Sequence, residues 1–384
     1  MKVAIPKEIR ENETRVAASP AMAKKLVELG LQVVVQSGAG LAASTPDEAF
    51  VEAGADIATD AAATYDGADL VLKVARPMTA DEGTDEMALL PSGTTLVGLL
   101  APLQHRDQVA AYAAGDVTAF AMELIPRISR AQSMDALSSQ SNLAGYKAVL
   151  DAANEFGRIF PMMMTAAGTV VPAKVLVLGA GVAGLQAIAT AKRLGAVVSA
   201  FDVRPAVKEQ VESLGGKFIE VADEDAESAE SAGGYATEMS EDYQRRQSEL
   251  IHETLKSQDI AICTALIPGS AAPTLITEQM VGGMKPGSVI VDLATETGGN
   301  CELSEHGKVV VKKDVSIVGH ANVPGRVPVD ASALYARNLL NFLSPMIDAE
   351  SKSLAIDWED EVNTGACLTR DGKVLHPLLT GGVN

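Results

Sequence analysis

The sequence predicts an α/β protein of two Rossmann-like, doubly wound parallel-sheet domains separated by a cleft. Short apolar runs alternate with helix-like stretches, one apolar run leads into a glycine-rich turn, and 384 residues suffice for two domains. Apolar strands that alternate with helices are typical of parallel sheets with helices on both faces.

In the first half, strands are expected at residues 3–5, 32–35, 70–72, 94–97 and 117–120, and helices at 20–29 and 106–113. In the second half, strands are expected at 174–178, 197–201, 217–220, 260–263, 288–292 and 316–318, and helices at 143–156, 182–194, 206–214 and 276–284. No short internal repeat accompanies this alternation.

The carboxyl-terminal segment is expected to return to the first domain. Residues 328–343 have helical spacing, and residues 362–369 and 374–379 resemble strands of short hairpins. The first domain is therefore expected to be discontinuous, with residues 1–136 plus 328–384, and the second to comprise residues 137–327.

Composition excludes several classes of function. The chain has 31 basic and 50 acidic residues, a formal charge of −19, which argues against nucleic acid and anionic lipid as partners. Three scattered cysteines do not make a disulfide scaffold or a cysteine metal site, and no histidine pair has metal-ligand spacing. We therefore expect a cytoplasmic protein without a metal.

Neither a membrane span nor a targeting segment is expected. The amino terminus becomes polar after five residues, so it lacks the apolar core of a signal peptide. The most apolar stretch, residues 175–191, has three glycines within 17 residues, whereas a spanning helix needs about 20 apolar residues. We interpret this stretch as strand, turn and helix.

The glycine-rich turn predicts a dinucleotide site. Gly179, Gly181 and Gly184 follow an expected strand and open an expected helix, and Asp202 ends the next strand, 18 residues past Gly184. This pattern lets a pyrophosphate approach the helix N-terminus, while the acid binds a ribose diol and disfavours a 2′-phosphate, so NAD(H) is favoured over NADP(H). The alternative is that this turn binds no nucleotide. Arg204, two residues after Asp202, could also bind a phosphate.

Two polar segments are further candidate parts of the cofactor site. Residues 127–142 contain Arg127, Gln132, Asp135 and Ser138, which suit an amide and a ribose, although Asp135 or Ser138 could equally cap the following helix. Residues 221–258 form a long acidic insertion with Tyr235 beside two glycines, either a lid or a solvated loop. His320 lies in an expected turn, and no nucleophile elbow, P-loop or CxxC motif is present.

The glycine turn, the polar segment and several other motifs resemble a known family, that of the alanine dehydrogenases and the proton-translocating NAD(P) transhydrogenases. Within it the chain is most similar to the soluble NAD(H)-binding component of the transhydrogenases. The resemblance covers the whole chain and rests on the motifs IPKE, MELIPRISRAQSMDALSSQSNLAGY, PMMMTAAGTV, GAGVAGLQAIATAKRLGAVV, AGGYATEM, TALIPG, MKPGSVIVDLA and NVPGRV.

The resemblance implies a set of site residues. It implies that Arg127, Gln132, Asp135, Ser138 and the mobile-loop residue Tyr235 position the cofactor for hydride transfer. It also assigns cofactor contacts to the glycine turn and to Ile128, Ser129, Arg130, Ser133, Met134, Val182, Asp202, Val203, Arg204, Gly234, Gln247 and Leu266.

The resemblance also implies partners. It implies a homodimer that holds NAD(H) and docks on an NADP(H)-binding beta subunit, which sits on membrane-spanning transhydrogenase subunits that translocate protons. Hydride would pass directly between the two nicotinamides, without a general acid or base. The chain itself would be peripheral to the cytoplasmic face of the inner membrane.

Two alternatives differ in chemistry. An alanine dehydrogenase would use Arg15 and Lys73 as substrate cations, but its histidine would fall near Leu99 and is missing, and Glu296 replaces its aspartate. A non-catalytic NAD-sensing module is the other alternative, against which the expected polar segment and lid argue.

Overall fold

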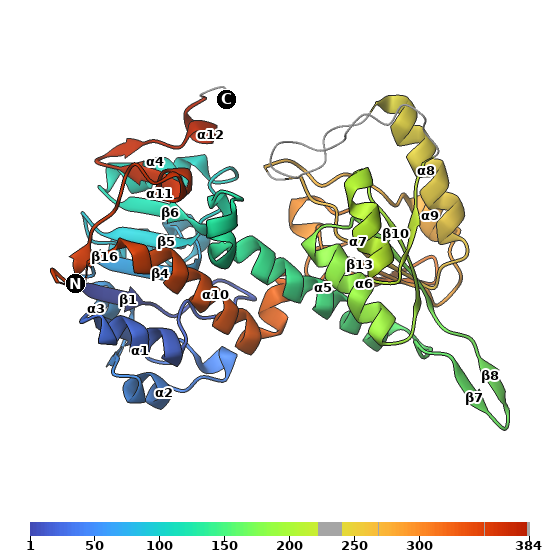
Figure 1. Cartoon of the computed structure of the whole chain (residues 1–384), viewed down its shortest axis with the longest axis horizontal. Coiled ribbons are helices and arrows are strands. Elements are labelled where there is room, and N and C mark those ends of the chain that lie inside the picture. Colours follow the sequence, from blue (N-terminus) through green and yellow to red (C-terminus); the bar gives the residue numbers. More distant parts are fainter. Residues whose placement is uncertain (222–239, 268, 349, 382–384) are drawn as a thin grey trace. The chain divides into compact units, whose positions relative to one another are not determined.

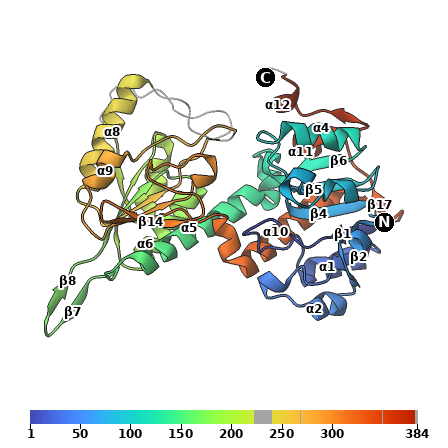
Figure 2. The same cartoon turned by 180° about the vertical axis from the view of Figure 1, so that it is seen from behind.

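The computed structural model describes residues 1–221, 240–267, 269–348 and 350–381. The chain divides into two compact units, Met1–Gln140 with Gly325–Asn384, and Ser141–Pro324. The helix α5 (Ala136–Glu155) begins in the first unit and continues in the second. Each unit is built around its own sheet (Figures 1 and 2).

Unit 1 contains an eight-stranded sheet in the order β19-β18-β6-β5-β4-β1-β2-β3. Its parallel strands are β1 (Lys2–Ile5), β2 (Gln32–Gln36), β3 (Asp56–Ala58), β4 (Leu70–Ala75), β5 (Thr95–Leu99) and β6 (Thr118–Ala121). The carboxyl-terminal strands β18 (Cys367–Arg370) and β19 (Lys373–Val374) add to the β6 edge in antiparallel fashion. The tail thus returns to the first half of the chain, as the sequence predicts.

Helices cover both faces of this sheet (Figure 1). One core packs α1 (Pro20–Glu28), α2 (Asp47–Glu52) and α10 (Pro328–Leu343) on the sheet, and the other packs α3 (Ala61–Tyr65) and α4 (Arg106–Ala114). Helix α1 begins locally because the Ser19 hydroxyl caps the amide of Met22 and Pro20 occupies the first turn. Short elements complete the unit: β16 (Ile347–Asp348), β17 (Ser353–Leu354), α11 (Glu361–Ala366) and α12 (Pro377–Thr380).

Unit 2 contains a seven-stranded sheet in the order β11-β10-β9-β12-β13-β15-β14. Its strands are β9 (Lys174–Leu178), β10 (Val197–Phe201), β11 (Lys217–Ile219), β12 (Ile260–Cys263), β13 (Val289–Asp292), β15 (Val315–Val318) and the antiparallel edge strand β14 (Val309–Lys312). The helices are α6 (Val182–Arg193), α7 (Lys208–Ser213), α8 (Glu241–Leu255) and α9 (Glu278–Gly282), with the later turns of α5.

Strand β9 shows why this sheet is covered on both faces. Val175 and Val177 belong to the core beneath α5, α6 and α7, whereas Leu176 and Leu178 belong to the core beneath α8 and α9. The chain winds from β9 to β10 and β11 in one direction, then returns to β12 and β13 in the other. The carboxyl end of β9 is therefore a topological switch point, the usual ligand position in such sheets.

The second expected hairpin strand, residues 374–379, is only partly a strand, because β19 ends at Val374 and Pro377–Thr380 form α12. Three other helices also differ from the expectations. Helix α5 begins at Ala136, not residue 143, because Asp135 caps it. Within the expected loop 221–258, Glu241–Leu255 form α8, which the Ser240 hydroxyl caps. Residues expected as a hairpin strand from 362 instead form α11, which the Asp360 carboxylate caps through the amide of Val362. The first turns of α5, α8 and α11 have few apolar residues, so the capping residue determines where each helix begins.

A hairpin that the sequence did not predict projects from unit 2. Strands β7 (Met163–Thr165) and β8 (Gly168–Val170) pair in antiparallel fashion and are exposed along their length (Figure 1). Its apolar side chains lie in water, with Met164 75% exposed. Among the described residues, no helix combines the length and apolarity needed to cross a bilayer.

Candidate functional site

The glycine turn of unit 2 joins β9 to α6 at the switch point. Gly179 has φ +97°, and a Cβ there would lie 2.8 Å from the Thr264 hydroxyl oxygen. A Cβ on Gly184 would lie 1.9 Å from the carbonyl oxygen of Gly179. A Cβ on Gly181 would meet only Arg204 Nη2, at 3.9 Å, among the described residues. The outer two glycines are required by the fold, and the middle one leaves the turn open.

A fourth glycine supports the turn from outside the motif. A Cβ on Gly145 of α5 would lie 2.0 Å from the carbonyl oxygen of Ala183, so α5 packs directly against the first turn of α6. Gly145 was not predicted, because nothing in a helical stretch shows which helix it will approach.

Asp202 lies beside the turn, as its position after β10 predicts. Its Oδ2 accepts hydrogen bonds from the amide of Ala180 at 2.7 Å and from Arg204 Nη2 at 2.8 Å. Its Oδ1 accepts from the amide and Nε of Arg204, both at 2.9 Å. The carboxylate therefore joins the glycine turn to the loop after β10.

The loop after β12 forms the other side of this region. The Thr264 hydroxyl donates to the carbonyl of Gly179 at 3.0 Å, and the buried Asn300 side chain binds both the amide and the carbonyl of Ala265. Asp292 in turn accepts hydrogen bonds from the amides of Asn300 and Ala294. These positioning residues were not predicted, although Asp292 ends an expected strand, which was a usable signal.

The remaining predicted cofactor residues of unit 2 are exposed or partly exposed. Val182 is 38% and Leu266 48% exposed. Val203 packs partly against the core beneath α8, and Gln247 lies half-buried on α8 itself. Gly234 and Tyr235 lie outside the described residues.

In unit 1, the predicted polar segment follows β6 and forms the 3₁₀ helix Ser129–Met134 before α5. Arg127, Ser129 and Gln132 are exposed, whereas Ile128 and Met134 pack partly against the core. The carbonyl of Ser133 accepts hydrogen bonds from the side-chain amides of Asn338 and Asn341 on α10. The segment is thus anchored through its apolar side chains and its backbone.

Asp135 and Ser138 are brought together. Asp135 Oδ1 accepts from the amide of Ser138 at 2.8 Å, and Oδ2 accepts from its hydroxyl at 2.5 Å. The capping interpretation of Asp135 is therefore confirmed. Arg130 is held differently: its guanidinium binds both carboxylate oxygens of Asp360, at 2.9 and 2.5 Å.

A buried charge cluster lies where the strand order of the unit 1 sheet reverses, between β1 and β4. Lys73 Nζ of β4 lies 2.6 Å from Glu86 Oε1 and 3.2 Å from Glu8 Oε2, and its side chain is fully buried. The Arg15 guanidinium donates two hydrogen bonds to Glu13, at 2.8 and 2.6 Å, and one to Gln140 at 2.9 Å. Both cations are therefore paired within the protein.

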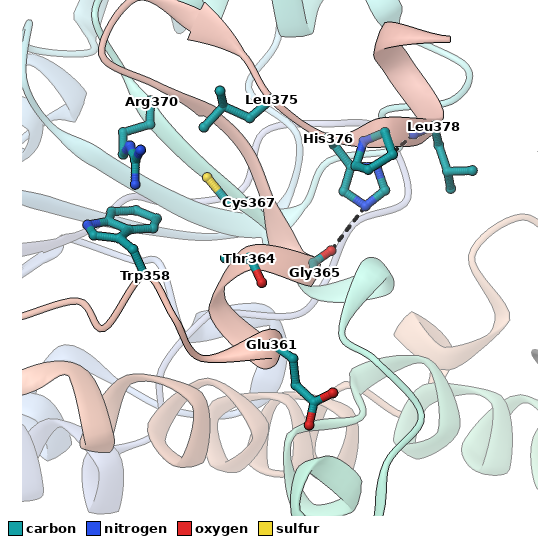
Figure 3. A pocket seen from close by; sticks show the side chains of 10 residues that line it. Trp358, Glu361, Thr364, Gly365, Cys367, Arg370, Leu375, His376 and Leu378 are labelled. Atoms are coloured by element: carbon teal, nitrogen blue, oxygen red, sulfur yellow. Dashed lines mark hydrogen bonds between the residues drawn. The ribbon is translucent and has the colours of Figure 1, made fainter. Parts of the chain in front are cut away.

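A separate pocket of about 590 Å³ in unit 1 is lined by residues of α11, β18 and α12, together with Trp358 and residues 375–376 (Figure 3). Arg370 stacks over the Trp358 ring at 4.2 Å, and His376 Nε2 lies 3.1 Å from the carbonyl oxygen of Gly365. None of the predicted site residues that the structure describes lines this pocket. Within the described ranges of the chain, no group of His, Cys, Asp and Glu could hold a metal ion.

Comparison with known proteins identifies the family. Residues 4–144 match the family described as alanine dehydrogenase/PNT, N-terminal domain, and residues 148–377 match its C-terminal domain. The chain belongs to the alanine dehydrogenase/PNT family. It is 63% identical over 381 residues to a Rhodospirillum rubrum protein named as the first portion of NAD(P) transhydrogenase subunit alpha, with 99% of each chain covered.

Solved structures agree with this assignment. The transhydrogenase from Sinorhizobium meliloti matches with a TM-score of 0.87 and 51% identity over 97% of this chain and 100% of that chain. An L-alanine dehydrogenase matches with a TM-score of 0.80 and 26% identity over 100% of this chain and 99% of that chain. The prediction of α/β, Rossmann-like parallel-sheet domains and the predicted membership of this oxidoreductase family are both confirmed, and the chain is closer to the transhydrogenase branch.

Proposed function

We propose that this chain binds NAD(H) and transfers hydride between it and NADP(H) held by a partner subunit. The observation that carries the proposal is Asp202, whose carboxylate lies hydrogen-bonded at the glycine turn. A carboxylate there accepts from ribose hydroxyls and repels a 2′-phosphate, so the site favours NAD(H).

The residues of unit 2 fit such a cofactor. Gly181 leaves the turn open, so the amides at the start of α6 would hold the pyrophosphate. The exposed side chains of Val182 and Leu266 would supply apolar contacts. The nicotinamide supplies the hydride, and we propose that Arg127, Gln132, Asp135 and Ser138 orient its ring and amide.

The proposal includes partners. The relative in R. rubrum is named as a portion of a subunit, which implies further subunits. We propose an NADP(H)-binding beta subunit and a proton-translocating membrane partner, with this chain peripheral to the cytoplasmic face of the inner membrane. The exposed apolar hairpin, with Met162, Met164 and Val171 each at least 60% exposed, supports a homodimer, because a large apolar patch in water favours association.

Alanine dehydrogenation is the second candidate, favoured by the likeness to L-alanine dehydrogenase. It would require Arg15 and Lys73 to bind a substrate carboxylate. Lys73 instead has Glu8 and Glu86 as partners, and Arg15 is paired with Glu13. An anionic substrate would have to compete with these internal carboxylates, which disfavours this activity.

Binding of nucleotides to the purified chain tests the proposal. Calorimetric titration with NADH and with NADPH should give binding of NADH and much weaker binding of NADPH. Asp202→Ala should weaken NADH binding several-fold. Preference for NADPH, or turnover of alanine with NAD by the chain alone, would overturn the proposal.

A further inference from the structure

The Asp202 carboxylate has no acceptor position left for a ribose. A carboxylate offers about four acceptor positions, two on each oxygen. Arg204 fills three of them, through its amide, its Nε and its Nη2, and the amide of Ala180 fills the fourth. The acid that should bind the cofactor is therefore saturated by the protein itself.

The Arg204 guanidinium also encloses this carboxylate. Only 5% of the Asp202 side chain is exposed, against 15% of the Arg204 side chain. Arg204 Nη2 is the atom that a Cβ on Gly181 would approach, so the guanidinium lies beside the open face of the glycine turn. A ribose cannot reach the carboxylate while the guanidinium is in this position.

We propose that the Arg204 side chain occupies the ribose position on Asp202, and that nucleotide binding displaces its Nε and Nη2 from the carboxylate. This inference rests on the proposed NAD(H) function. The two backbone donors, from Ala180 and Arg204, stay in place and keep the carboxylate oriented. Two ribose hydroxyls then replace two guanidinium donors, so the number of hydrogen bonds to Asp202 is conserved.

This exchange makes Arg204 a determinant of specificity. A ribose with a 2′-phosphate has lost one of the two hydroxyl donors, so it cannot replace both N–H groups of Arg204. It also brings negative charge toward Asp202. NADP(H) would thus have to break the ion pair without restoring its hydrogen bonds, whereas NAD(H) restores them.

Removal of the competing side chain provides the test. Arg204→Met should lower the dissociation constant for NADH roughly threefold to tenfold, the range for one partly buried ion pair. Arg193→Met removes the same charge from the exposed far end of α6 and should leave NADH affinity unchanged. Reduced nicotinamide mononucleotide, which has no adenosine ribose, should bind both variants and the unaltered chain equally.

A second variant tests the specificity. Asp202→Asn should gain measurable NADPH binding, because Arg204 is then released toward a 2′-phosphate. The double variant Asp202→Asn, Arg204→Met should lose this gain. Weaker or unchanged NADH binding by Arg204→Met would overturn the inference, since Arg204 would then only position Asp202 or play no part.

A measurement on the unaltered chain is independent of how the variants fold. In arginine-labelled protein, the Nε–H of Arg204 should exchange slowly with solvent and should exchange faster when NADH is added, with Arg204→Lys used to assign the signal. Slow exchange with NADH bound would overturn this inference but would leave the proposed NAD(H) function standing. Absence of NADH binding by the unaltered chain would overturn the proposed function, and the inference with it.

Discussion

Gly184 lies so close to Gly179 that a Cβ on Gly184 would come within 1.9 Å of the Gly179 carbonyl oxygen. The first turn of α6 is thereby packed against the end of β9 with no room for a methyl group. At Gly181, by contrast, a Cβ would have Arg204 Nη2 as its only neighbour, at 3.9 Å, among the described residues. Two glycines of one motif thus serve different purposes.

We expect Gly184→Ala and Gly181→Ala to separate stability from binding. Gly184→Ala forces the strand and helix apart, so it should lower the melting temperature and abolish NADH binding together. Gly181→Ala should leave the melting temperature almost unchanged but weaken NADH binding, because the methyl group would occupy the approach to the pyrophosphate. Thermal unfolding and NADH titration of both variants check this; equal melting temperatures for the two would contradict it.

Asp135 and Ser138 should contribute unequally to stability. Asp135→Ala removes the N-cap of α5 and should cost about 1 kcal/mol of unfolding free energy. Ser138→Ala removes only the hydroxyl donor and leaves the backbone cap in place, so its cost should be smaller. Urea unfolding of the two variants and of the double variant measures this, and a larger loss for Ser138→Ala would show that the cap is not the main contact.

The buried Lys73 should be far more important for stability than a surface lysine. Lys73→Met leaves Glu8 and Glu86 without their cation in the core and should cost about 3–5 kcal/mol. Lys25→Met removes an exposed pair with Glu28 and should cost less than about 1 kcal/mol. Urea unfolding compares the two; a similar small loss for both would mean that the buried cluster is not ionised as described.

Glu123 should make stability fall with rising pH. Burial raises the pKa of its carboxyl to about 7 from an ordinary 4.5, although Oε1 accepts from the amide of Ala101. Because the folded state then binds the extra proton, the contribution is complete below pH 4.5 and is lost as the pH rises through 7. It amounts to on the order of 3 kcal/mol.

Comparison with Glu123→Gln isolates this group from the many other carboxylates. Unfolding in urea at about pH 5 and about pH 8, on either side of the folded-state pKa, can be followed by the fluorescence of Trp358, the single tryptophan, which lies in unit 1. The unaltered chain should lose more stability between these pH values than Glu123→Gln. Glu52→Gln on the exposed side of α2 should behave as the unaltered chain. Equal pH dependence in all three would show that Glu123 does not titrate in this range.

What could be predicted from sequence was mainly local. The strand before Gly179, the helix after it and Asp202 at the end of the next strand form a pattern of fixed spacing, and the structure contains all three. Helix α8 was not predicted because only Tyr243, Ile251 and Leu255 are buried along its 15 residues. A helix with so few apolar positions looks like a loop.

Contacts between distant segments could not be predicted. The distance between Gly145 and Ala183 depends on how α5 crosses α6, and the pairing of Lys73 with Glu8 and Glu86 depends on which strands adjoin. Asp202 and Arg204 are close in sequence, yet no sequence pattern shows whether the Arg204 side chain binds Asp202 or points into solvent. The sequence pattern shows an acid for the ribose but not the arginine that already binds it.

The most direct test of the central claim follows one hydrogen atom. NADH that carries deuterium at its transferable position is given to this chain together with the NADP(H)-binding partner and NADP⁺, in ordinary water, and the product is analysed by mass spectrometry. The account predicts NADPH that contains the deuterium, formed only when the partner is present. NADPH with hydrogen from solvent, or no product with the partner while alanine and NAD are turned over by the chain alone, would contradict it.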